Sequence, residues 1–252
     1  MVHREELAAY LNETLDVHSI TDYAPNGLQV EGRDEIRRLV TGVSVSQALF
    51  ERAVQAEADA ILVHHGFFWK GEESRIVGLK AQRLRRLLSV DLNLFAYHLP
   101  LDVHPEFGNN AGLAELLECT VEQRVTVRGI PGLLWLGRVA TPVTAAALAE
   151  RLAHTLGQQP VRVGAGTEPI RRIAWCSGGG ERLIEEAIAH GAEAFISGEL
   201  SEPITHIARE AGVHFFAAGH HATERCGVQR LGEHIAATFG IAHEYIEIPN
   251  PA

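Results

Sequence analysis

Two stretches of the sequence match each other and decide the fold. Residues 37–65 read RRLVTGVSVSQALFERAVQAEADAILVHH, and residues 171–199 read RRIAWCSGGGERLIEEAIAHGAEAFISGE. A constant shift of 134 residues aligns the two stretches without a gap, with seven identical positions and five more of similar type. A repeat of this size predicts an internal duplication that produces two similar α/β domains.

The sequence around each copy alternates between short apolar runs and segments with helical spacing. The predicted strands are 37–44, 60–63, 93–97, 172–176, 194–197, 213–217 and 244–248, and the predicted helices are 4–11, 47–57, 76–88, 110–117, 182–189, 203–211 and 223–239. This alternation is typical of βαβ units with parallel or mixed sheets. We therefore predict the α/β class.

The middle of the chain departs from this alternation. Two strand-like runs, 121–130 and 133–140, are joined through Gly129-Ile-Pro-Gly132 and predict a β-hairpin. Residues 144–156 then predict a helix, with Thr141 or Thr144 as its N-cap.

This hairpin region marks the change from one domain to the next. We predict a first α/β domain over residues 1–125 and a second over residues 126–252, with the C-terminal segment packing back on the first. A ligand site is expected in the cleft between them.

Composition limits the class of protein. The 252 residues include 22 Lys+Arg against 32 Asp+Glu, a net charge of −10, and 46% are hydrophobic. That apolar content excludes intrinsic disorder, and three scattered cysteines exclude a disulfide scaffold. The acidic balance makes DNA an unlikely general partner. The longest stretch without Asp, Glu, Lys or Arg, residues 211–223, is too short for a membrane span of ~20 apolar residues. Because the first residues resemble a helix start and not a signal peptide, we expect a cytoplasmic protein.

Histidines gather directly after three predicted strands. His64 and His65 follow the strand at 60–63, and His98, Asp102 and His104 follow the strand at 93–97. Ligands bind at the carboxyl ends of strands in open α/β sheets, and imidazole is a common metal ligand. The alternative for the His64-His65 pair is a polar turn. The alternative for Asp102 is a helix cap, for which Asn109 or Asn110 serves equally well.

The third group is His220, His221 and Glu224, after the strand at 213–217. If a helix begins near Thr223, Glu224 and one of the two histidines face the same point. The alternative for Glu224 is a favourable charge at a helix N-terminus.

Taken together, these groups indicate a metal centre. Mixed imidazole and carboxylate ligands suit Zn, Fe, Mn, Co or Ni. Five or more ligands exceed the needs of one tetrahedral ion, whereas two ions bridged by a carboxylate use them all. Two-metal sites of this kind perform hydrolysis.

The same motifs are long enough to resemble a known family. They are His64-His-Gly-Phe-Phe-Trp-Lys-Gly71, His98-Leu-Pro-Leu-Asp-Val-His-Pro-Glu-Phe-Gly-Asn-Asn110, Gly198-Glu-Leu-Ser-Glu202 and Ala218-Gly-His-His-Ala-Thr-Glu224. Together they strongly resemble the Nif-three-like dinuclear-metal-centre proteins, also named GTP cyclohydrolase I type 2 homologues, in their short bacterial form. The resemblance runs from Asp22-Tyr-Ala-Pro-Asn-Gly-Leu-Gln-Val30 to Ile248-Pro-Asn-Pro251.

The resemblance implies two divalent metal ions in each chain. By motif position, His64 and Asp102 would hold one ion, His65 and His220 the other, and Glu224 would bridge the two. His98 would be a further ligand or a proton-transfer group. The resemblance also implies a ring-shaped homohexamer with sites that face an internal cavity.

The reaction is not fixed by these ligands, which suit hydrolysis of a purine ring, a phosphoester or an amide. We favour a metal-dependent hydrolase acting on a nucleotide-like or other small molecule. In it, Glu224, His98 and Glu199 are the candidate catalytic residues, with Glu199 either a general base or a partner for a histidine. The alternative is a non-enzymatic metal-binding assembly or interaction protein in metal handling or stress response.

Two further segments are candidates for substrate contact. Ser177-Gly-Gly-Gly180 precedes a predicted helix and offers backbone N–H groups to a phosphate, although a plain strand-to-helix turn explains it better. Phe68 and Trp69 offer rings for stacking on a base, although packing explains them better.

Overall fold

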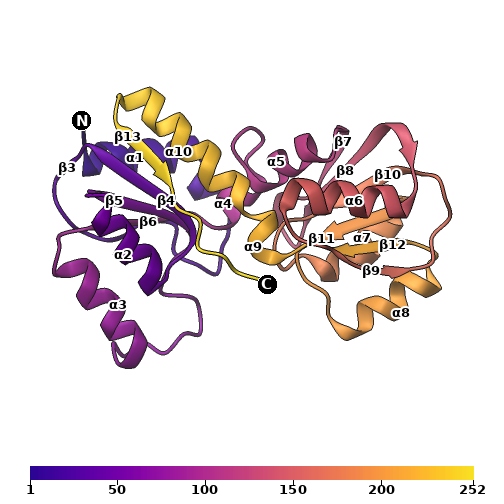
Figure 1. The fold of residues 1–252 in the computed structure, drawn as a ribbon, viewed down its shortest axis with the longest axis horizontal. Helices are drawn as coiled ribbons and strands as arrows, with labels where there is room; N and C mark the ends of the chain where they lie inside the picture. Colours follow the sequence, from indigo (N-terminus) through magenta and orange to yellow (C-terminus); the bar gives the residue numbers. More distant parts are fainter. The chain divides into compact units, whose positions relative to one another are not determined.

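The computed structural model describes residues 1–252 and divides them into two compact units. Unit 1 comprises Met1–Leu101 and Gly227–Pro249, and unit 2 comprises Asp102–Cys226 and Asn250–Ala252 (Figure 1). None of the helices combines the length and the apolar character needed to cross a bilayer.

This division assigns residues 102–125 to the second unit, whereas the sequence pattern placed them in the first domain. The reason is strand pairing, because β7 (Cys119–Val127) runs antiparallel to β8 (Ile130–Val143) inside the unit 2 sheet. The C-terminal segment returns to unit 1 because β13 (Ala242–Tyr245) pairs with β4 (Arg38–Ser44).

Unit 1 is built on a five-stranded sheet with the order β13–β4–β5–β6–β2. The strands from β13 to β6 are parallel, and β2 is antiparallel to β6 at one edge. The other strands of this sheet are β2 (Gly27–Val30), β5 (Ala60–His65) and β6 (Asn93–Ala96), while β1 (Val2–His3) and β3 (Glu35–Ile36) form a separate antiparallel pair. The helices are α1 (Arg4–Thr14), η1 (Val17–Ser19), α2 (Gln47–Gln55), α3 (Gly78–Leu88) and α10 (Arg225–Phe239, which starts in unit 2).

Local chemistry explains why the β4–α2–β5 segment folds as it does. The Ser46 side chain accepts a hydrogen bond from the Leu49 N–H and caps α2, which satisfies one of the open donors at the helix start. The helix buries Leu49 and Phe50 against the sheet. Residues 60–64 of β5 are all buried, as expected for a central parallel strand covered on both faces.

Unit 2 contains a six-stranded mixed sheet with the order β7–β8–β10–β11–β12–β9. Strands β10, β11 and β12 are parallel, whereas the β7–β8 hairpin and β9 pair antiparallel at the two sides. The remaining elements are α4 (Leu99–Val103, which starts in unit 1), α5 (Asn109–Leu116), α6 (Ala145–Leu156), β9 (Val161–Gly164), β10 (Ile170–Trp175), η2 (Glu181–Leu183), α7 (Ile184–Ala189), β11 (Ala194–Ser197), α8 (Glu202–Glu210), β12 (His214–Ala217) and α9 (His220–Thr223).

The predicted α/β class is confirmed, with parallel and antiparallel strands in both sheets. The predicted hairpin and the predicted helix after it are also present. The hairpin reverses at Arg128 and Gly129, both with positive φ, and Thr144 rather than Thr141 caps α6 by accepting the Ala147 N–H.

The two repeated stretches have the same strand register. Leu39 lies opposite Ala60 in unit 1, and Ile173 lies opposite Ala194 in unit 2, which is the same pair after a shift of 134 residues. In each repeated stretch, one carboxylate accepts hydrogen bonds from the backbone at the start of the first strand. Asp59 accepts the N–H groups of residues 37 and 38, and Glu193, its counterpart, accepts those of residues 171 and 172.

Candidate functional site

Three histidine side chains meet at the carboxyl ends of two neighbouring strands of unit 1. His64 and His65 end β5, and His98 follows β6, so the parallel pairing of β5 with β6 brings them together. The ring centroids are 4.6 Å apart for His64 and His65, 5.0 Å for His64 and His98, and 5.6 Å for His65 and His98. One nitrogen from each ring lies within 4.8 Å of the others, so the three could hold a metal ion.

Each of these rings is fixed through its Nδ1 atom. His64 Nδ1 lies 2.9 Å from the Tyr97 carbonyl oxygen, and His65 Nδ1 lies 2.9 Å from the Ser44 hydroxyl. A carbonyl oxygen only accepts hydrogen bonds, so Nδ1 of His64 carries the proton and Nε2 is the basic nitrogen of the ring. This tautomer is the one in which a histidine binds a metal through Nε2.

His98 is held by a buried carboxylate that the sequence analysis did not identify as functional. Its Nδ1 lies 3.0 and 3.2 Å from the two oxygens of Asp22, and both side chains are almost fully buried. Asp22 also accepts the Leu99 N–H and an amide N–H of Asn26. The only available signal was that the motif resembling the family begins at Asp22.

The environment of Asp22 keeps it ionised. Burial raises the pKa of a carboxyl group, but the hydrogen bond and charge of His98, with the donors from Asn26 and Leu99, outweigh burial and lower the pKa of Asp22 from 3.8 to about 2. An ionised Asp22 accepts hydrogen bonds only, which leaves Nδ1 of His98 as the donor.

Aromatic side chains surround the same histidines. Tyr23 and Trp69 each meet the His98 ring edge to face at 5.0 Å, and the Trp69 indole N–H donates to the Gly66 carbonyl. Trp69 therefore has the packing role that the sequence analysis favoured. Phe68 lies under the ammonium group of Lys80.

Asp102, the predicted carboxylate ligand, is buried in unit 2, where two side chains donate to it. Its Oδ1 accepts from the Ser177 hydroxyl at 2.7 Å and from the Asn109 amide at 2.9 Å. Asn109, the first residue of α5, thus positions this carboxylate and does not cap the helix, whose N-cap is Gly108. The side chain of the second asparagine, Asn110, accepts the Ser177 N–H, and its backbone carbonyl accepts the Trp175 indole N–H.

His220, the first residue of α9, lies between two carboxylates of unit 2. Its Nδ1 is 2.6 Å from Glu199, and its Nε2 is 3.2 Å from Glu224, which is 2% exposed. Burial lowers the pKa of His220, but the contacts with Glu224 and Glu199 outweigh burial and raise the pKa to about 9. The predicted proximity of Glu224 to a histidine is present, although α9 ends at Thr223 and Glu224 lies in the break before α10.

The glycine loop 177–180 packs against these carboxylate and imidazole groups. Gly178 has φ +59°, and a Cβ there would lie 2.0 Å from Glu224 Oε1, so only glycine fits. The Gly178 N–H already donates to the Thr223 hydroxyl. The loop therefore makes room for Glu224 and His220, as a strand-to-helix turn does, and one of its N–H groups is already satisfied.

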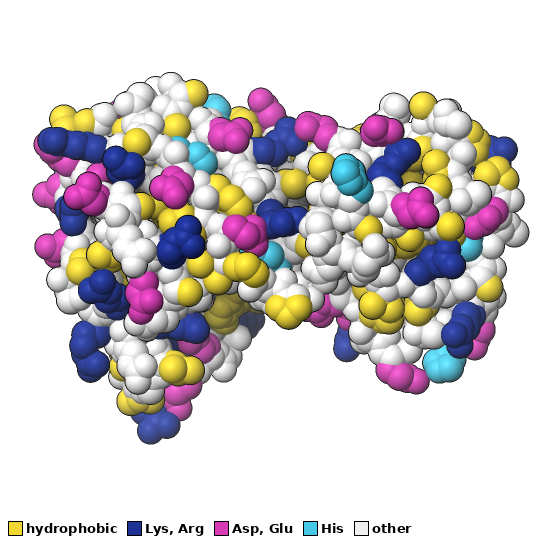
Figure 2. Space-filling model, viewed as in Figure 1, with side chains coloured by type: hydrophobic (Ala, Val, Ile, Leu, Met, Phe, Trp, Pro, Cys, Tyr) yellow, Lys and Arg dark blue, Asp and Glu magenta, His cyan; other side chains and the backbone are white.

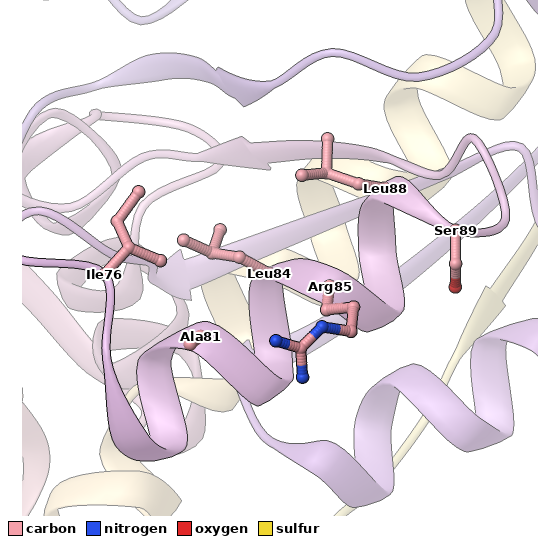
Figure 3. A pocket seen from close by; sticks show the side chains of 6 residues that line it. All are labelled: Ile76, Ala81, Leu84, Arg85, Leu88 and Ser89. Carbon is pink, nitrogen blue, oxygen red and sulfur yellow. The ribbon is translucent and has the colours of Figure 1, made fainter.

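Other candidate residues have contacts of a different kind. His104 Nδ1 accepts hydrogen bonds from the N–H groups of Glu106 and Phe107, so this nitrogen is used within the loop that follows α4. Cys176 is fully buried, and burial raises the pKa of its thiol well above 9.0, so it stays protonated. A surface hollow on α3, drawn in Figure 3, contains no histidine, cysteine or carboxylate; its residues are Ile76, Ala81, Leu84, Arg85, Leu88 and Ser89.

Comparison with known proteins identifies one family over the whole chain. The model of the family described as Duf34/NIF3 (NGG1p interacting factor 3) matches residues 2–251. A protein of Allochromatium vinosum named GTP cyclohydrolase 1 type 2 homolog is 51% identical over 100% of this chain and 98% of its own length. A protein of the same name from Escherichia coli K12 is 49% identical over 98% of each chain.

Solved structures give the same result. Protein ybgI, described as of unknown function, superposes with a TM-score of 0.96 at 48% identity over 100% of both chains. A protein of Thermus thermophilus superposes with a TM-score of 0.88 at 34% identity, again over 100% of both chains.

Proposed function

The chain belongs to the Duf34/NIF3 family, and from this premise we propose that it is a dinuclear-metal-binding protein that acts as a metal-dependent hydrolase. The observation that carries the proposal is the cluster of His64, His65 and His98, with rings fixed through Nδ1 and nitrogens within 4.8 Å of one another. The relatives are named as homologues of a GTP cyclohydrolase, which favours a nucleotide-like or other small substrate.

We assign the ligands as the family resemblance implies. His64 and Asp102 hold one ion, His65 and His220 hold the other, and Glu224 bridges them. The donors fit such ions. Unit 1 supplies His64, whose tautomer leaves Nε2 basic, and His65, which is held through Nδ1, and unit 2 supplies buried carboxylates and a histidine. When bound, a pair of ions activates water and stabilises the oxygens of a displaced group.

The surrounding residues of each unit have distinct tasks in this proposal. Glu199 accepts from Nδ1 of His220 and orients that ring, which favours the partner role over the general-base role. Ser177 and Asn109 donate hydrogen bonds to the Oδ1 of Asp102 and so fix the orientation of its carboxylate. His98, to which this assignment gives no ion, is the candidate for proton transfer.

Two wider features complete the proposal. We propose that the units arose by duplication, supported by the common register of β4–β5 and β10–β11 and by the matching Asp59 and Glu193 contacts. In that relation His65 and Glu199 are equivalent positions. We also propose a cytoplasmic homohexamer as the working assembly.

The first test is the number of metal ions per chain, measured by mass spectrometry on protein purified without chelators or a histidine tag. Two equivalents are expected, followed by metal-dependent turnover on a panel of nucleotides and other small esters and amides. Glu224→Gln should reduce turnover at least ~100-fold while the fold is kept. Two bound ions with no turnover on any substrate would favour the non-enzymatic assembly role instead.

A further inference from the structure

We infer that the 250–252 segment and Gln158 together cap helix α9 and thereby position His220. Residues 250–252 belong to unit 2 and run beside α9 (Figure 1). The inference rests on the proposed function, in which His220 is a ligand. It goes beyond that function because it gives a positioning role to residues outside the ligand set.

Helix α9, which carries His220, has no side-chain cap of its own. It spans only the four residues His220–Thr223, and a helix this short is not stable without contacts from other segments. Its N-cap is Gly219, which has no side chain to accept an N–H group from the first turn. The end of α9 is held at Thr223, whose hydroxyl accepts the Gly178 N–H. The start of α9 therefore needs an acceptor from elsewhere in the chain.

The 250–252 segment supplies that acceptor. The backbone oxygen of Ala252 accepts the His221 N–H at 3.0 Å. His221 is the second residue of α9, so its N–H is one of those that an N-cap side chain would otherwise satisfy. The Asn250 side chain accepts the Ala252 N–H at 3.1 Å, which holds the segment in a turn. The segment thus does for α9 what the Ser46 side chain does for α2.

Gln158 joins the 250–252 segment to the start of the helix. Its Nε2 donates a hydrogen bond to the Pro251 carbonyl at 2.9 Å. The same side chain also fills the space next to Gly219, where a Cβ would lie 2.6 Å from Gln158 Oε1. Because Gly219 also has φ +96°, a residue with a capping side chain does not fit at this position. The cap consequently comes from a separate segment.

The position of the helix start determines the direction of the His220 ring. His220 directly precedes the capped N–H of His221, and its two nitrogens face Glu199 and Glu224. A metal site loses affinity when its supporting contacts leave a ligand about 1 Å out of place. Loss of the cap should therefore weaken the ion that His220 holds.

The test compares the wild-type chain with two variants, Gln158→Glu and a chain from which residues 250–252 are removed. Gln158→Glu keeps the size of the side chain but removes the N–H that reaches Pro251. In chelator competition of Zn²⁺-loaded protein, each variant should bind one of its two ions about 10-fold more weakly and the other ion unchanged. The matched control is Gln159→Glu, an exposed neighbour with the same charge change, which should leave both affinities unchanged.

A double-variant comparison separates positioning from a general structural effect. In a His220→Ala background, removal of residues 250–252 should not change the affinity for the ion that remains, because the ligand through which the segment acts is gone. A further loss of about 10-fold in that background would overturn the inference.

Hydrogen exchange of the metal-free protein tests the cap without any ion. Peptides that contain α9 should exchange at least ~10-fold faster in both variants and unchanged in Gln159→Glu. If removal of residues 250–252 prevents folding, which circular dichroism would show, Gln158→Glu decides the matter. Unchanged exchange would overturn the inference, as would two ions bound with unchanged affinity in both variants. Wild-type protein that binds no ion, with faster exchange of α9 in the variants, would overturn the proposed function and support the cap.

Discussion

At the scale of single residues, the contacts of His220 set a pH dependence for the metal-free protein. Its pKa is raised from 6.5 to about 9, so the folded state holds a proton that the unfolded state releases between these values. The stabilisation from this proton should therefore be fully present below pH 6.5. The free energy of unfolding should fall as pH rises from 6.5 to 9, by at most ~1.4 kcal/mol per pH unit. Burial lowers the pKa of His214 and of His243 from 6.5, so these two residues change the free energy of unfolding only below the pH range in which His220 does.

Urea unfolding of chelator-treated protein at pH 6, 7.5 and 9 measures this slope. Glu199→Gln removes one of the two carboxylates at His220 and should flatten it. The matched control is Glu202→Gln, since Glu202 contacts the exposed His206 in a surface pair that contributes little. A flat wild-type profile, or the same flattening in the control, would contradict the assignment.

The candidate site was only partly predictable from its residues. His64, His65 and His98 follow predicted strands, and the rule that ligands lie at strand ends was enough to group them. Asp22 and Ser177 were not identified as partners of His98 and Asp102, because these contacts join residues 76 and 75 positions apart in sequence. Such contacts depend on tertiary packing, which local patterns do not encode.

At the scale of elements, two carboxylates hold equivalent strand starts and should have similar effects on stability. Asp59 and Glu193 each accept two backbone N–H groups, which are left unsatisfied when the carboxylate is removed. Asp59→Ala and Glu193→Ala should each lower the free energy of unfolding by about 2 kcal/mol. Chemical denaturation measures this. Glu51→Ala and Glu185→Ala, exposed helix positions that are also related by the repeat, should change it by less than ~0.5 kcal/mol. Comparable losses at all four positions would show that general charge effects dominate.

Interior elements were predicted better than edges and breaks. Strands β4, β5, β6 and β10–β12 are short apolar runs, and their burial explains that signal. β2 and β9, four residues each, were missed because they sit at sheet edges and gain their strand geometry only by pairing with β6 and β12. The predicted single helix over 223–239 is instead α9 and α10, with Glu224 at the break between them.

At the scale of the whole molecule, charge and composition limit the partners. The net charge is −10, and the face drawn in Figure 2 carries side chains of both signs with no continuous basic stripe. Because affinity for DNA depends on many phosphate contacts with Lys and Arg, the acidic balance keeps the prediction that DNA is not a general partner. This agrees with a small-molecule or metal ligand held by a few groups, and it leaves the reaction to be decided by the site.

Metal removal should show how the two units depend on the ions. The proposed dinuclear centre takes ligands from both, and an ion bound only to the folded state stabilises it by about 2.7 kcal/mol at 100 times its Kd. For a chain of this length that corresponds to a Tm increase of about 5–10 °C. Calorimetry of chelated and metal-loaded protein measures the increase. With Asp102, His220 and Glu224 replaced, three of the five proposed ligands are lost, and the Tm increase should disappear. Hydrogen exchange gives a local readout, because amides of β5 in unit 1 and of β12 in unit 2 should gain protection on metal loading of the wild-type protein but not of this variant. A wild-type protein whose Tm and amide protection do not change on metal loading would contradict the proposed metal centre.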